Sequence, residues 1–237
     1  MGKKKLQRFA ENATFKHVVQ PNLTDTLHTG NAIKGKWNEQ MFKNNNPITL
    51  ELGCGRGEYS VELARKNQHR NYIGVDIKGA RLWRGAKTAF EENLKNVAFL
   101  RSRIEFITHY FDKNEIDEIW ITFPDPQLKK RRAKNRLTHS SFLTLYQQFV
   151  KDDNTVHLKT DSLFLHKYTK KILNHNGIEI IEQSENIYAQ STSETLAIKT
   201  TYEQKFLEQA LPITYLKFKL DKLKKLTEPE HSDDKIF

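Results

Sequence analysis

Short apolar runs alternate with amphipathic stretches from residue 48 to residue 218. Runs rich in β-branched residues predict strands, and apolar positions at helical spacing predict helices. The predicted strands cover residues 48–52, 71–75, 97–100, 118–123, 155–159, 178–181 and 213–218. The predicted helices cover residues 58–66, 79–94, 138–150, 164–174 and 202–210, with one more ending near residue 111. Strands that alternate with helices predict an α/β fold, with a seven-stranded, mostly parallel sheet covered by helices on both faces.

The two ends of the chain differ from this middle part. Residues 1–47 have little periodicity and begin with lysines at 3–5, so we expect an N-terminal basic arm or extension. Residues 7–37 are compatible with an arm or a short helix. No long crossover helix precedes the last strand, so we expect that strand to be antiparallel. The α/β domain is predicted over residues 48–219, and residues 220–237 are expected to form a loose, charged C-terminal tail.

Charge and cysteine content indicate the kind of partner and the cellular compartment to expect. Lys and Arg number 39 against 29 Asp and Glu, and the net charge of +10 suggests a polyanionic partner, most commonly nucleic acid. No run of about 18 apolar residues exists, so no membrane span is expected. The N-terminus lacks the apolar stretch of a signal peptide. The single cysteine, Cys54, excludes an intramolecular disulfide and fits a reducing compartment, so a cytoplasmic location is expected.

A glycine-rich loop follows the first predicted strand. After Glu51 the chain reads LGCGRG, with Gly53, Gly55 and Gly57 at G-x-G-x-G spacing, unlike G-x-G-x-x-G or a P-loop. Asp76 ends the next strand, where a carboxylate can accept hydrogen bonds from two ribose hydroxyls. A tight turn and a strand-terminal acid are the simpler interpretation. The pattern resembles the S-adenosylmethionine site of class I methyltransferases, which implies a Rossmann-like fold and this cofactor.

A Pro-Asp-Pro loop follows the fourth predicted strand. Prolines on both sides stiffen the backbone around Asp125, which we expect to lie above the glycine-rich loop. Six cations follow within eight residues, an arrangement that would attract phosphates: Lys129, Lys130, Arg131, Arg132, Lys134 and Arg136. A solvated charged loop is the alternative.

Three motifs together are similar to the signature of the bacterial tRNA (guanine-N7-)-methyltransferases. They are FPDP with the following KKR and RLT at residues 123–138, LKTD at 158–161, and TTYE at 200–203. The resemblance covers residues 48–218. It implies an S-adenosylmethionine-dependent enzyme that methylates N7 of a guanosine in the tRNA variable loop, with tRNA as its partner.

The resemblance also implies roles for individual residues. It implies cofactor contacts at Glu51, Asp76, Asp125 and Arg103, in addition to the loop glycines Gly53, Gly55 and Gly57. It implies tRNA contacts at Lys129, Asp161, Thr200, Thr201, Tyr202 and Glu203, to which the basic run adds Lys130, Arg131 and Arg132. Asp125 is expected to be the catalytic residue.

Two departures from the family pattern concern this site. The family usually continues FPDP with Trp-Pro, whereas this chain has Gln127 and Leu128, so a packing or stacking aromatic is missing. Arg103 stands where an acid commonly lies near the adenine, with Glu105 two residues on. The nine histidines are scattered without metal-ligand spacing, so no metal is expected.

Guanine N7 carries a lone pair and no proton, so its methylation requires positioning and exclusion of water and no general base. Asp125 or Asp161 would favour the cationic product. Three other functions remain open: an RNA-binding module without catalysis, a methyltransferase for another substrate, and a nicotinamide oxidoreductase, which the glycine spacing disfavours. No obligate protein partner is expected, and the chain is compatible with a monomer or a homodimer.

Overall fold

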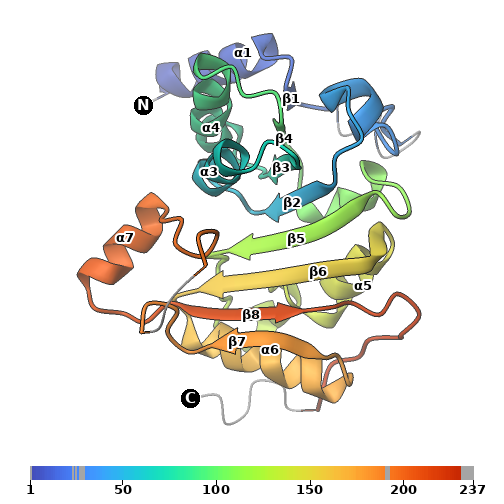
Figure 1. Ribbon diagram of the computed structural model, residues 1–237, viewed down its shortest axis with the longest axis vertical. Helices are drawn as coiled ribbons and strands as arrows, with labels where there is room; N and C mark the ends of the chain where they lie inside the picture. Colours follow the sequence, from blue (N-terminus) through green and yellow to red (C-terminus); the bar gives the residue numbers. More distant parts are fainter. Residues whose placement is uncertain (1, 23, 25, 27–29, 190–192, 231–237) are drawn as a thin grey trace.

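The computed structural model describes the chain except for residues 1, 23, 25, 27–29, 190–192 and 231–237. Its described residues form an eight-stranded sheet in the order β1-β4-β3-β2-β5-β6-β8-β7 (Figure 1). The strands are β1 Val18–Val19, β2 Ile48–Leu52, β3 Asn71–Val75, β4 Val97–Leu100, β5 Ile116–Thr122, β6 Val150–Thr160, β7 Ile180–Ser184 and β8 Thr214–Phe218. The helices are α1 Gly2–Thr14, α3 Glu58–Lys66, α4 Gly79–Glu91, α5 Ser140–Gln147, α6 Leu163–His175 and α7 Thr201–Glu208.

The sheet confirms the predicted α/β class. Strands β1 to β6 pair in parallel, and β8 lies antiparallel between β6 and β7. The sheet has one strand more than predicted, because Val18 and Val19 pair with Phe99 and Leu100 at the edge. Two residues are too few to produce an alternating pattern in the sequence.

Some element boundaries differ from the prediction. The helix expected to end near residue 111 is a 3-10 helix, Ile104–His109. Helix α5 begins after His139, whose Nδ1 accepts a hydrogen bond from the Ser141 N–H at 3.2 Å. Thr138, the predicted cap, is buried and its hydroxyl bonds to that of Thr169. His139 therefore caps the helix, because the Thr138 hydroxyl is buried against Thr169.

The two faces of the sheet have different chemistry. Successive side chains of a strand point to opposite faces, so Leu158 belongs to the apolar core that α5 and α6 complete, while Lys159 points to the other face. Helices α3 and α4 cover that other face over β3 and β4. Figure 1 shows α6 behind β7 and β8, on the side away from the viewer. Lys159, a buried polar residue of this second face, belongs to the LKTD motif, one of the predicted functional motifs.

The N-terminal residues pack against the sheet domain. In α1, Asn12 donates to the Gly79 carbonyl at 2.9 Å, and Glu11 accepts hydrogen bonds from Trp83 and Lys87 of α4. Further along, Trp37 is fully buried and donates from its indole to the Tyr110 carbonyl. The described part of residues 1–47 is therefore folded onto the domain.

The C-terminal segment is anchored where the sequence suggested a loose tail. Leu220 and Leu226 are buried. Glu228 accepts hydrogen bonds from the Ser140 N–H at 2.7 Å and from the Tyr168 hydroxyl at 3.0 Å, which connects α5 to α6. Two apolar residues among many charges are a weak sequence signal, although they fix residues 220–228 in place. None of the helices among the described residues is long and apolar enough to cross a membrane.

Gly57 sets how closely α3 approaches α4. Its φ is +69°, and a Cβ there would lie 2.5 Å from the Phe99 ring and 3.3 Å from the Gly85 Cα. We expect Gly57→Ala to lower the free energy of unfolding by about 1–2 kcal/mol through backbone strain, with about 1–3 kcal/mol more from overpacking.

Gly30→Ala is the matched control. Gly30 has φ +73°, but apart from its chain neighbours no atom of the residues that the structure describes lies within 4 Å of an added Cβ, so we expect the backbone term alone. Urea unfolding of both variants measures the difference. An equal loss of unfolding free energy in both variants would show that close packing at Gly57 does not contribute to stability.

Candidate functional site

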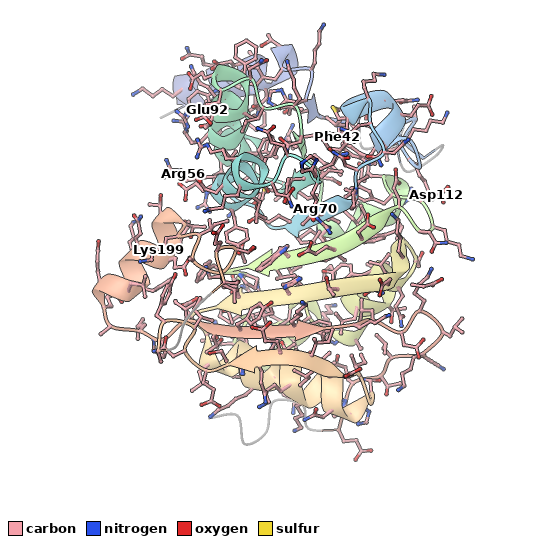
Figure 2. The ribbon with its side chains drawn as sticks, in the orientation of Figure 1. Phe42, Arg56, Arg70, Glu92, Asp112 and Lys199 are labelled. Atoms are coloured by element: carbon pink, nitrogen blue, oxygen red, sulfur yellow. The ribbon has the colours of Figure 1, made fainter. Side chains whose placement is uncertain are left out.

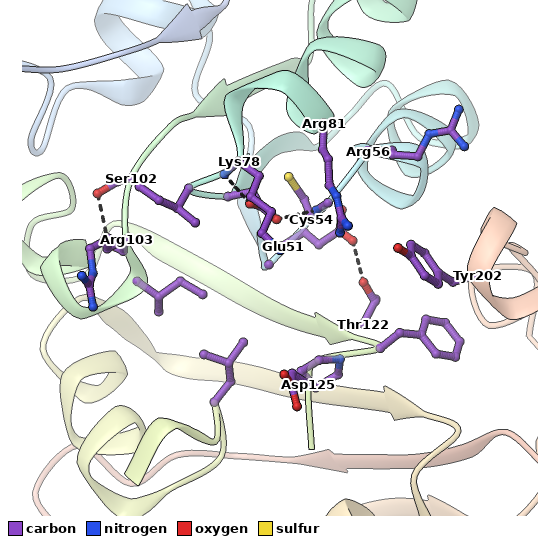
Figure 3. Close-up of a pocket in the computed structure, with 18 of the residues that line it drawn as sticks. Glu51, Cys54, Arg56, Lys78, Arg81, Ser102, Arg103, Thr122, Asp125 and Tyr202 are labelled. Carbon is purple, nitrogen blue, oxygen red and sulfur yellow. Dashed lines mark hydrogen bonds between the residues drawn. The ribbon is translucent and has the colours of Figure 1, made fainter. Parts of the chain in front are cut away.

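A cavity of about 730 Å³ lies at the carboxyl ends of the central strands (Figure 3). Loops after β2, β3, β4 and β5 form its walls, and Tyr202 of α7 closes one side. The residues of the predicted site that line it are Glu51, Gly53, Gly55, Asp76, Arg103, Asp125, Thr200 and Tyr202. The fold therefore brings together side chains up to about 150 positions apart in the sequence.

The glycine-rich loop is fastened to the end of β3. The Gly55 N–H donates to Asp76 Oδ2 at 2.9 Å, and the Lys78 N–H donates to Asp76 Oδ1 at 2.6 Å. Gly55 has φ +56°, and the nearest atom to a Cβ built there is 4.0 Å away. Its backbone thus borders open cavity space, which lets a ligand approach closely. Gly57, in contrast, does not line the cavity, and its role is the helix packing described above.

Glu51 lies at the floor of the cavity and is almost completely buried. Its Oε2 accepts hydrogen bonds from the Ser60 N–H at 3.0 Å and the Ser60 hydroxyl at 2.5 Å, and its Oε1 accepts one from the Thr122 hydroxyl at 2.6 Å. Burial raises the pKa of Glu51 to about 7, although these hydrogen bonds lower it. The pKa of Glu51 therefore lies near neutral pH.

The Pro-Asp-Pro loop forms the wall opposite Lys78 in Figure 3. Its ends, Phe123 and Gln127, both have φ +47°, a conformation that costs about 1–3 kcal/mol for a non-glycine residue and persists only where the surroundings impose it. Asp125 Oδ1 accepts a hydrogen bond from the Gln127 N–H at 3.0 Å, and the Asp125 side chain is exposed to the cavity. The loop therefore holds one carboxylate in a fixed position.

The basic run contains five exposed cations and one buried arginine. Its cations on and before the 3-10 helix Lys130–Asn135 are exposed, namely Lys129, Lys130, Arg131, Arg132 and Lys134. Arg136 is fully buried and corrects the prediction that all six cations face phosphates. Its guanidinium donates to the Gln127 carbonyl at 3.1 Å and lies 4.3 Å from the Tyr168 ring centroid. Arg136 therefore supports the Pro-Asp-Pro loop from behind.

Arg103 and Glu105 form an ion pair at the end of the cavity next to β4. Their side chains meet at 2.8 Å and are both about half exposed. The pair lowers the pKa of Glu105 and keeps its carboxylate ionised beside the guanidinium. Ile77 and Ile104 line the same region with apolar surface. This combination suits a flat, partly apolar ring with polar edges.

A buried ion pair fixes the chain before α7. Lys159 Nζ lies 2.8 Å from Glu203 Oε1 and also donates to the Leu196 and Ile198 carbonyls, each at 2.8 Å. The Tyr188 hydroxyl donates to Glu203 at 2.6 Å. Burial lowers the pKa of Lys159, and the Glu203 carboxylate opposes that shift.

The predicted role of Glu203 as a tRNA contact therefore needs correction. Its side chain is completely buried and has Lys159 and Tyr188 as partners, so it positions the start of α7. Thr200 caps that helix by accepting a hydrogen bond from the Glu203 N–H at 3.2 Å.

The other residues of the TTYE motif differ in their surroundings. Thr201 donates to both carboxylate oxygens of Glu58 at 2.7 Å, which links α7 to α3. Tyr202 is 45% exposed and its ring borders the cavity. Asp161 does not line the cavity, although it follows β6, the parallel neighbour of the strand β5 that leads into the Pro-Asp-Pro loop. Burial raises the pKa of Asp161.

Thr122 and Lys159 are site residues that the sequence did not single out. Each lies inside a motif that was recognised, Thr122 one residue before FPDP and Lys159 within LKTD. A lysine near the end of a buried strand indicates a buried partner, because a lysine side chain is almost never fully buried unless its charge is paired. Within the part of the chain that the structure describes, no group of three His, Cys, Asp or Glu side chains is arranged to hold a metal ion.

Residues 45–216 match a family model described as "Putative methyltransferase". The tRNA (guanine-N(7)-)-methyltransferase of Christiangramia forsetii is 54% identical over 92% of this chain and 98% of its own length. The protein of the same name from Bacteroides fragilis is 46% identical over 97% of this chain and 91% of its own length.

Solved structures share the fold. The 16S rRNA methyltransferase KamB superposes with a TM-score of 0.61 at 13% identity, over 77% of this chain and 92% of that one. An antibiotic-related methyltransferase gives a TM-score of 0.58 at 20% identity, over 80% and 94%. Identities this low establish the Rossmann-like class I architecture alone.

The Lys159–Glu203 pair is open to a direct stability test. We expect Lys159→Met to lower the free energy of unfolding by about 3–5 kcal/mol, because it leaves the Glu203 carboxylate buried without a counter-ion. Adding Glu203→Gln removes that charge while the amide oxygen still accepts from Tyr188. The double variant should therefore be more stable than Lys159→Met in urea unfolding, and a double variant that loses the sum of both single effects would rule out the coupling.

Proposed function

Because this chain belongs to the bacterial tRNA (guanine-N7-)-methyltransferase family, we propose that it transfers a methyl group from S-adenosylmethionine to N7 of a guanosine in the tRNA variable loop. The observation that carries the proposal is one cavity in which the glycine-rich loop, Asp76 and the Pro-Asp-Pro loop meet, beside five exposed cations. The proposal implies a bacterial tRNA partner and action in the cytoplasm.

The cavity fits the proposed cofactor in size and chemistry. Asp76 has carboxylate lone pairs left for ribose hydroxyls beyond the two backbone donors it accepts, and Gly55 allows close approach. Ile77 and Ile104 would cover the faces of the adenine, with the Arg103–Glu105 pair at its edge. When bound, S-adenosylmethionine supplies an electrophilic methyl group on a sulfonium.

The protein's own contribution to the reaction is position and charge. Guanine N7 presents a lone pair without a proton, so no side chain has to act as a base. Asp125 is held by the stiff loop at the cavity wall, where its carboxylate would orient the base and favour the positive charge that methylation places on the purine. The exposed ring of Tyr202 would exclude water from the same region.

The basic run would bind the tRNA backbone next to the cavity. Lys129, Lys130, Arg131 and Arg132 are exposed and follow the Pro-Asp-Pro loop directly, so phosphates near the reacting guanosine are their natural ligands. Asp161 would lie at the border between this surface and the cavity. Among the residues assigned to tRNA, these, Thr201 and Tyr202 have exposed or half-exposed side chains, whereas Thr200 and Glu203 are buried.

The activity is tested with bulk tRNA that lacks 7-methylguanosine and with methyl-labelled S-adenosylmethionine. Digestion to nucleosides should show label in 7-methylguanosine, and a transcript with adenosine in place of the variable-loop guanosine should take up none. Label in 1- or 2-methylguanosine would overturn the proposed chemistry, and label retained in the substituted transcript would overturn the proposed position.

Asp125 should act by position and charge, without taking a proton. We expect both Asp125→Asn and Asp125→Ala to slow a single turnover, with Ala slower because it loses shape and hydrogen bonding as well as charge. At saturating cofactor and tRNA, the wild-type rate should be nearly flat from about pH 6.5 to 9. A general base titrating in that range would make the rate rise tenfold per pH unit below its pKa. Such a slope, lost in Asp125→Asn, would contradict the positioning role.

Glu51 should couple cofactor binding to pH. Its pKa is raised to about 7, and a cationic ligand favours the ionised carboxylate, so binding below pH 7 releases a proton. Affinity for S-adenosylmethionine should therefore rise from pH 5.5 towards pH 7, by at most about tenfold per unit. Calorimetry in two buffers of different ionisation enthalpy counts the protons. Glu51→Gln should bind without this proton release, and release that persists in the variant would assign it to another group.

A further inference from the structure

A second hollow of about 290 Å³ adjoins the cofactor cavity. It lies between α3, α4 and the start of α7, and shares Arg56 and Glu58 with the larger cavity. Four cations line it: Arg56, Arg65, Arg84 and Lys199. Figure 2 shows Arg56 and Lys199 on the same side of the molecule, just before α3 and just before α7. Arg56 also lines the larger cavity, whereas Lys199 lines the second hollow alone.

Two of the four cations are already neutralised. Arg65 is bonded to the carboxylates of both Glu62 and Glu92. Arg84 lies 3.3 Å from Glu91 and donates to the Thr88 hydroxyl. Arg65 connects α3 to the end of α4, whereas both partners of Arg84 lie on α4 itself, and each arginine has its charge balanced within the protein.

The other two cations keep hydrogen-bond donors for a ligand. Arg56 is 45% exposed, and among the described residues the carboxylate nearest its guanidinium is that of Glu58, 3.4 Å from Nη1, so most of its five N–H donors are left for a ligand. Lys199 is exposed, and among the described residues no carboxylate lies within 4 Å of its Nζ. Its Nζ lies 5.1 Å from the Tyr188 ring centroid, which orients the side chain without neutralising it.

The position of these two cations suits a polyanion that already occupies the cavity mouth. Arg56 follows β2 in the glycine-rich loop, and Lys199 precedes the helix that carries Tyr202, whereas the basic run follows β5. In Figure 3, Arg56 and Tyr202 lie together on one side of the cavity. A nucleotide that enters the cavity has a backbone phosphate on each side, so one basic run can hold only part of that backbone.

We propose that Arg56 and Lys199 form a second phosphate-binding surface, separate from the basic run, which holds the tRNA backbone beside Tyr202. The inference rests on the proposed function, because it takes tRNA to be the polyanion at the cavity. Each phosphate contact releases condensed counter-ions, so the number of contacts appears in the salt dependence of binding. The two surfaces together would fix the reacting nucleotide from both sides.

The test measures tRNA dissociation constants from about 50 to 300 mM KCl for wild type, Arg56→Gln and Lys199→Gln. Each variant should bind about 3- to 10-fold more weakly at low salt, and the slope of log affinity against log salt should fall by up to about one. Lys199→Arg should restore the slope. Neutralising Lys130, Arg131 and Arg132 together gives the response of the first surface for comparison.

Lys66→Gln with Lys95→Gln is the matched control. Both lysines are exposed, at the end of α3 and just before β4. They therefore lie at the amino ends of the strands, away from the cavity at the carboxyl ends. Its slope should equal that of wild type. Calorimetry of S-adenosylmethionine with each variant separates tRNA effects from cofactor effects, which matters for Arg56 at the cavity border.

An unchanged slope in both Arg56→Gln and Lys199→Gln, with 7-methylguanosine formed by wild type, would overturn this inference and leave the proposed function intact. Reduced slopes in an enzyme that makes no 7-methylguanosine would support the second surface and overturn the proposed function instead. A slope that falls equally in the lysine control would show a general charge effect and also contradict the inference.

Discussion

The buried contact between Lys159 and Glu203 supports the whole C-terminal side of the cavity. One ammonium group binds a carboxylate and the Leu196 and Ile198 carbonyls, so a strand in the middle of the sheet holds a segment about 40 residues further along. A buried pair is weak evidence for stability, because desolvation opposes the attraction between the charges. Its effect here is on position, because the same contacts hold residues 196–203 against β6.

Much of the fold was predictable because local patterns and global structure agree. The boundaries of β2, β3, β4 and α3 match the sequence prediction, since short apolar runs mark the strands and the glycine-rich loop separates β2 from α3. Strand β1 and the anchoring of residues 220–228 were missed, because a two-residue strand and two buried leucines leave no periodicity. Here tertiary packing, which a single sequence does not display, decides the structure.

The site was predictable to the level of motifs, and burial decided what each residue does. Asp76, Asp125 and Tyr202 come together at one cavity, as the motif positions imply. Arg136 and Glu203 belong to the same motifs but lie fully inside the protein, where they hold the Pro-Asp-Pro loop and α7. Sequence alone gives equal weight to a charged residue that meets the substrate and to one that orders the loop behind it.

The place of β8 in the sheet has a consequence for how the chain is made. It is the last strand in the sequence, yet it lies between β6 and β7, which pairs with β8 and no other strand of the described sheet. During synthesis, β6 therefore presents an unpaired edge, and β7 has no partner, until residues 214–218 have left the ribosome. An open edge of this kind recruits other strands, so a nascent or prematurely terminated chain is the form most exposed to aggregation.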